Sequence, residues 1–136
     1  MATIQDIVTG AFQKLGLIGA GNSPEAQDSA YALNELNDMM LEMNGKDVFI
    51  NWETMALTGT FPLEATHEGG VKAMLALRVA NTYGGDGLLS SGLVRQAKDA
   101  FIRIWGDYHR SEPLTADNGL TQMPGNWYSG VDNVNV

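Results

Sequence analysis

Histidines are the first candidates for chemistry, because two histidines on one helix face can bind zinc. His67-Glu68 resembles the start of the His-Glu-x-x-His motif of zinc proteases. That motif needs a second histidine four residues after the first, but Val71 stands there, and His109 belongs to a separate predicted helix. We therefore expect no metal site and no cofactor, and we assign surface or capping roles to both histidines.

Two glycine-containing segments fail as nucleotide-binding motifs. Gly19-Ala20-Gly21 begins like a dinucleotide fingerprint, but Pro24 takes the place of the third glycine and no strand is predicted before it. Gly45-Lys46 is followed by Asp47, and Met40 stands where a phosphate-binding loop requires glycine. The chain also has no Gly-x-Ser-x-Gly nucleophile elbow. These motifs therefore predict that the protein is not an enzyme.

Four carboxylates recur at helical spacing, which places them along one helix. Such groups can work as an acid and base pair or bind a hard cation, although a solvated edge is the ordinary interpretation. An edge that lines a channel is the functional alternative. The possible channel-facing residues are Asp28, Glu35, Asp38 and Glu42.

Four methionines are more typical of core filling than of a cofactor site, and methionine also suits adaptable interfaces. They are Met39, Met40, Met43 and Met74.

Composition limits the classes of partner. The 136 residues fit one domain with an extension, and a formal charge of −8 repels phosphate and anionic membranes. Sequence-specific DNA binding is therefore not expected. The absence of cysteine excludes disulfides and thiolate metal sites and favours an intracellular origin. We also expect a soluble protein, because neither a signal peptide nor eighteen consecutive apolar residues can be found.

Apolar spacing predicts an all-α fold of about four helices that positions these residues. Thr3 and Asp6 form a capping-box pair for a first helix, which Gly16 ends. Ser23 is placed to cap a second helix, with Pro24 at its first position. That helix is expected to end at Asn44 and Gly45.

The second half of the chain predicts two more helices. Thr66 is placed to cap a third helix that runs to about Tyr83 and has few polar positions, so it should be buried. Ser90 or Ser91 is placed to cap a fourth helix over residues 92–109. We expect its inner stripe to consist of Ala97, Phe101, Ile104, Trp105 and Tyr108.

Two segments do not follow the helical pattern. Residues 47–63 are rich in β-branched and aromatic side chains and predict an extended arm or β-hairpin insertion in a helical domain of residues 1–110. Residues 111–136 predict an extended C-terminal docking segment. Both retain apolar side chains that need another surface, which predicts protein interfaces. The expected interface residues are Val48, Phe49, Ile50, Trp52, Phe61, Leu114, Leu120, Met123, Trp127 and Tyr128.

Three segments carry a resemblance to a known family. They are Ile7-Val8-Thr9-Gly10-Ala11-Phe12-Gln13-Lys14-Leu15-Gly16, Leu33-Asn34-Glu35-Leu36-Asn37-Asp38-Met39-Met40-Leu41-Glu42 and Leu77-Arg78-Val79-Ala80-Asn81-Thr82-Tyr83-Gly84. Together with the order of the elements over residues 4–110, they resemble the head-to-tail adaptor proteins of tailed bacteriophages, also called tail accessory factors or packaged-DNA stabilisation proteins. Met43 departs from the family, which often has tryptophan there.

The resemblance implies a structural protein of the virion neck that assembles in the host cytoplasm. It implies a ring of twelve copies below the portal protein, joined to a tail or nozzle protein, that helps to retain packaged DNA. Partners would be the protein itself, the portal and the tail, with no membrane. Double-stranded DNA would pass without sequence-specific binding, past carboxylates that repel it over about 8–10 Å at physiological salt.

Three alternatives stay open at this point. The first is another neck or tail completion protein of the virion. A small helical regulator that binds nucleic acid would need a basic face, for which Arg95, Lys98 and Arg103 are available but diluted by Asp99 and Asp107. A wall hydrolase would need two carboxylates at a defined separation, and no such pair is identified.

Overall fold

The computed structural model describes residues 2–45 and 48–109, apart from the side chain of Asp86. It confirms an all-α fold. Within the described part, four α-helices and two short 3-10 helices form and no strand does. They are α1 (Ile4–Lys14), α2 (Ala26–Met43), η1 (Ala65–His67), α3 (Glu68–Tyr83), η2 (Gly85–Leu88) and α4 (Ser91–Tyr108). None of the described helices is long and apolar enough to cross a membrane.

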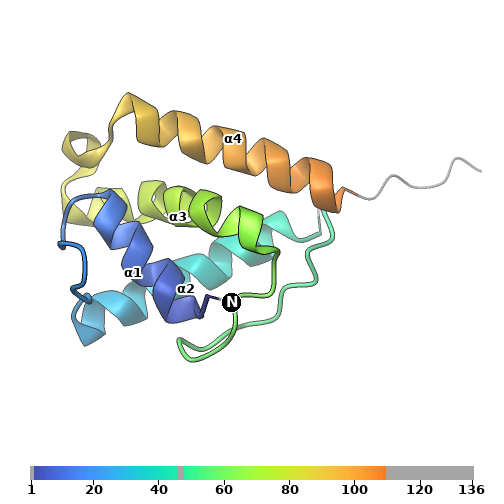
Figure 1. Cartoon of the computed structure of the whole chain (residues 1–136), viewed down its shortest axis with the longest axis horizontal. Coiled ribbons are helices and arrows are strands. Elements are labelled where there is room, and N and C mark those ends of the chain that lie inside the picture. The colour runs from blue at the N-terminus through green and yellow to red at the C-terminus, as the bar shows by residue number, and fades with distance from the viewer. Residues whose placement is uncertain (1, 46–47, 110–136) are drawn as a thin grey trace, which may run out of the picture.

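The α3 helix is the centre of the fold, as its apolar sequence predicted. It lies between α4 on one side and α1 and α2 on the other, and it contacts all three (Figure 1). Small residues allow the close approach of α4: a Cβ atom on Gly70 would lie 2.4 Å from the Cβ of Ala100. The core is therefore organised around one helix that is buried on most of its faces.

Local capping explains where α1 begins and ends. The Thr3 hydroxyl accepts a hydrogen bond from the Asp6 amide at 3.2 Å, and the Asp6 carboxylate accepts one from the Thr3 amide at 2.9 Å. This is the predicted capping box. Gly16, with φ of +75°, lies just beyond the end of the helix in a conformation that other residues rarely adopt.

The predicted start of α2 is wrong by two residues. Glu25, and not Ser23, is the N-cap, and its side chain makes no capping hydrogen bond. The end of α2 lies at Asn44, as predicted. The Asn44 side-chain oxygen accepts hydrogen bonds from the amides of Ile50 and Asn51 at 3.2 and 3.3 Å. This asparagine therefore joins the end of α2 to the extended segment that follows.

Residues 48–64 form an extended segment that lies on the domain, and they do not project from it as an arm. Its two isolated antiparallel bridges pair Thr60 with Thr3 and Val48 with His109. The first-turn amides of Ile4 and Gln5 donate to the carbonyls of Gly59 and Leu57 at 2.8 and 3.0 Å. The extended segment thus satisfies donors that every helix start leaves free.

The interface predicted for the extended segment needs correction. Four of its five residues are buried by the chain itself, with exposed fractions of 5% or less: Val48, Ile50, Trp52 and Phe61. Trp52 and Phe61 pack edge to face, with ring centroids 6.4 Å apart. Phe49 is the exception and is 48% exposed. The expectation failed because a β-like pattern shows which side chains need cover, but does not show that this domain's own helices supply it.

Candidate functional site

The outer face of α4 carries three of the six exposed large hydrophobic side chains among the described residues. Phe101, Ile102 and Trp105 are 46%, 66% and 41% exposed. The predicted inner stripe is therefore wrong at Phe101 and Trp105, and the helix instead buries Leu93, Ala97, Ala100 and Ile104. The small residues of α4 face α3, because the two helices approach closely. The large aromatic side chains of α4 therefore lie on its outer face.

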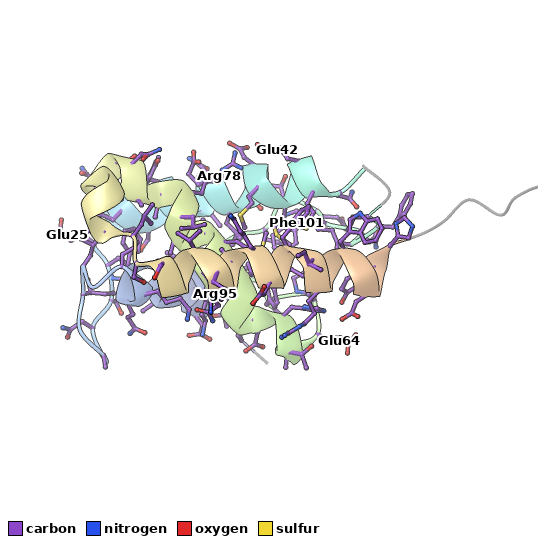
Figure 2. All side chains as sticks on the ribbon, turned by 90° about the horizontal axis from the view of Figure 1, so that it is seen from above. Glu25, Glu42, Glu64, Arg78, Arg95 and Phe101 are labelled. Atoms are coloured by element: carbon purple, nitrogen blue, oxygen red, sulfur yellow. The ribbon has the colours of Figure 1, made fainter. Side chains whose placement is uncertain are left out.

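These side chains border a groove between α2 and α4, with α3 as its floor. Figure 2 shows Phe101 in the space between α4 and α2, on the same face as Arg78 and Glu42. The groove has two hollows, of about 340 and 510 Å³. Both are lined by Met39, Met74, Arg78 and Phe101. We call this feature the α2–α4 groove.

The two ends of the α2–α4 groove differ. Met43, Val48 and Trp105 line the end near the C-terminus of α4, whereas Leu77, Lys98 and Ile102 line the other end. Methionine side chains are unbranched and polarisable, so they can repack around different partners. The arrangement contains no nucleophile with an adjacent base, and it suits the binding of an apolar peptide segment.

One arginine determines the charge at the edge of the groove. Arg78 donates through Nε to Glu35 at 3.0 Å and through both terminal nitrogens to Glu42. The hydrogen bonds to Glu42 raise the pKa of Arg78 against the opposing effect of burial. The ion pair leaves the α2 edge of the groove less negative than the sequence of α2 suggests.

The four carboxylates predicted to line a channel do not form one cluster of free charge. Glu35 and Glu42 share Arg78, while Asp28 accepts a hydrogen bond from the Tyr83 hydroxyl at 2.7 Å. Burial and this hydrogen bond raise the pKa of Tyr83. Asp38 is exposed. Three of the four carboxylates therefore help to attach α2 to α3.

The two histidines pack against different side chains. His67 is not a surface residue, since its side chain is 1% exposed and its Nε2 lies 2.8 Å from Asp107 Oδ2. It does occupy the N-cap position of α3, although its side chain makes no capping hydrogen bond. The His109 ring stacks on Trp105, with centroids 4.0 Å apart. Among the residues that the structure describes, no three histidine, cysteine or acidic side chains are grouped so that they could hold a metal ion.

The basic residues of α4 do not share one face. Arg95 and Arg103 line a hollow of about 280 Å³ together with His67 and Asp99, whereas Lys98 lines the α2–α4 groove. A nucleic-acid-binding helix would present such residues together to one groove of a duplex. The arrangement therefore gives no support to the regulator alternative.

The α2–α4 groove was missed in the sequence, although one signal was present. Large apolar residues occur in succession at Phe101 and Ile102 and again at Trp105, more than one helix face can bury. The predicted tail residues Leu114, Leu120, Met123, Trp127 and Tyr128 lie outside the described residues.

No protein-family model matches the chain, and a search of curated proteins also found no match.

Proposed function

We propose that this protein is a structural head-to-tail connector of a tailed bacteriophage. In this role, copies form a ring below the portal, join the portal to the tail or nozzle, and help to retain packaged DNA. The proposal is supported by the resemblance of three segments to adaptor proteins and by the order of elements, in which two helices and an extended segment precede a central helix and a last helix.

The observation that carries the proposal is the apolar α2–α4 groove. Solvated apolar surface of this kind marks sites where other polypeptides bind. A ring closes when one patch of each subunit fits a different patch on the next copy, and a groove on one face can serve as one of the two patches. Binding, and no catalysis, is therefore the proposed activity, with the virion neck as its location and the host cytoplasm as the place of assembly.

The charge of the chain agrees with contact to passing DNA without tight binding. A formal charge of −8 repels a phosphate backbone, so a duplex in the ring would stay free to move. Asp38 is exposed, whereas the other three proposed channel carboxylates interact with α3. Asp38 is accordingly the first of the four to test for a place in the channel.

The test is assembly with the portal protein encoded by the same phage. The purified chain, mixed with portal rings, should form a complex whose added ring is visible by electron microscopy. Phe101→Asp should reduce its occupancy at least tenfold, because a charge in the groove opposes burial by a partner. Gln13→Asp, at an exposed position of α1, is the control and should assemble normally. Absence of any complex with the unchanged chain would contradict the connector assignment.

A further inference from the structure

The chain leaves its described part beside the α2–α4 groove. The last turn of α4 is held there, because the Phe49 amide donates to the Tyr108 carbonyl at 3.0 Å and Val48 pairs with His109. Val48 and Trp105 also line one end of the groove. The C-terminal segment therefore starts at the mouth of the groove, and not on a remote face.

The remaining chain is long enough to cover the groove. Along α4, the lining side chains from Ala97 to Trp105 span about 12 Å at a rise of 1.5 Å per residue. Four extended residues cover about the same distance. Residues 110–136 can thus turn at the mouth and run back along the groove without straining the connection.

The chemistry of residues 111–136 complements the groove. This segment contains acidic residues at Glu112, Asp117 and Asp132 and no lysine or arginine. Lys98, which is exposed, lies at the groove end away from the chain exit. At the exit end the groove is lined by Glu42, whose carboxylate is paired with Arg78. The segment also has apolar side chains that match a groove floor of methionine and phenylalanine, namely Leu114, Leu120, Met123, Trp127 and Tyr128.

We propose that residues 111–136 dock into the α2–α4 groove of their own chain, with Trp127 and Tyr128 as anchors. A tethered segment experiences an effective concentration in the millimolar range, far above the micromolar concentration of other copies in a dilute solution. This inference does not depend on the connector function.

Disulfide trapping tests the proposal directly, because the chain contains no cysteine. The pair Ile102→Cys and Ser129→Cys places one thiol in the groove and the other beside the anchors. The control pair, Gln13→Cys and Ser129→Cys, uses an exposed position of α1 that lines a separate hollow. In full-length protein at low micromolar concentration under mild oxidation, the groove pair should form an intramolecular disulfide on the order of tenfold faster than the control.

A third substitution shows whether the groove itself causes the faster reaction. Phe101→Lys, added to the groove pair, should lower the rate to that of the control, with circular dichroism confirming the helical fold. Equal rates for the two pairs, disulfide-linked dimers in place of monomers, or no effect of Phe101→Lys would each overturn the proposal. No portal protein is present, so failure here is separate from failure of the connector assignment.

Discussion

Asn37 attaches the extended segment to α2 through three side-chain hydrogen bonds. Its side-chain oxygen accepts hydrogen bonds from the Trp52 indole and the Met55 amide at 3.1 and 3.0 Å, and its nitrogen donates to the Met55 carbonyl at 3.1 Å. Asn37 itself is buried in α2. Its amide therefore replaces water for three groups that the extended segment brings into the domain.

Replacement of this amide should be costly. Asn37→Ala leaves the Trp52 indole and both Met55 backbone groups without their partner, so we expect the free energy of unfolding to fall by roughly 2–4 kcal/mol. Urea denaturation followed by circular dichroism measures the change. Asn34→Ala, at an exposed position of the same helix, is the control and should stay within about 0.5 kcal/mol of the unchanged protein. A similarly small effect at Asn37 would contradict this account.

The capping box of α1 should make stability depend on pH. Hydrogen bonds from the backbone and side chain of Thr3 lower the pKa of Asp6. The folded state therefore favours the ionised carboxyl, and this contribution is present above the unfolded pKa and is lost as pH falls through the lower, folded pKa. Asp6→Asn should destabilise the protein by at most about 1 kcal/mol at pH 7, since the group is exposed.

The measurement is urea denaturation of both proteins at pH 7 and at pH 2.5. The difference between the unchanged chain and Asp6→Asn should shrink at the lower pH, because the contribution of the ionised carboxyl is lost as the pH falls through the lowered, folded pKa of Asp6. A difference that stays constant over this range would show that the ionisation of Asp6 does not contribute to the capping box.

At the scale of elements, local signals identified some helix ends and missed others. The N-caps of α2 and α3 are Glu25 and His67, where Ser23 and Thr66 were predicted. Thr3, Gly16 and Ser90 act on neighbouring backbone groups, so short sequence windows identified the start and end of α1 and the start of α4. The face that α4 buries depends on how closely α3 approaches it. That distance is determined by Gly70 and Ala100, which are far apart in sequence.

The α3–α4 contact offers a test with neighbouring glycines. Gly70→Ala places a methyl group against Ala100, and we expect a loss of about 1–3 kcal/mol from overpacking. Gly69→Ala meets nothing closer than the Gln96 amide nitrogen at 4.0 Å, so it should stabilise α3 by up to about 1 kcal/mol. Thermal and urea unfolding of both variants compare the signs. Equal effects at the two positions would mean that the helices do not meet at Gly70.

At the scale of the whole molecule, the sequence predicted which apolar groups need cover but not what covers them. The aromatic side chains of residues 48–64 were expected to be covered by a partner protein. Trp52 and Phe61 are instead buried within the domain itself. The opposite error occurred at Phe101 and Trp105, which were expected inside and are exposed. Both errors arise because burial depends on packing between segments distant in sequence, which periodicity within one segment does not contain.

The fold that results presents different surfaces on its two sides. The α2–α4 groove is apolar and has Arg78 at its edge. A hollow formed by α1 and α3 is lined instead by polar side chains that include Asp6, Glu68 and Lys72. A molecule with an apolar binding surface in one place and a polar surface in another can associate in a defined orientation, which closed assemblies require.

The pairing of Val48 with His109 also has a mechanical consequence. A pull on the C-terminal end of the chain would not act on the last turn of α4 alone, because the Phe49 amide holds the Tyr108 carbonyl. The load would pass into residues 48–51 and, through the Asn44 side chain, into the end of α2. Two helices would thus resist together a force that would otherwise unwind one of them from its end.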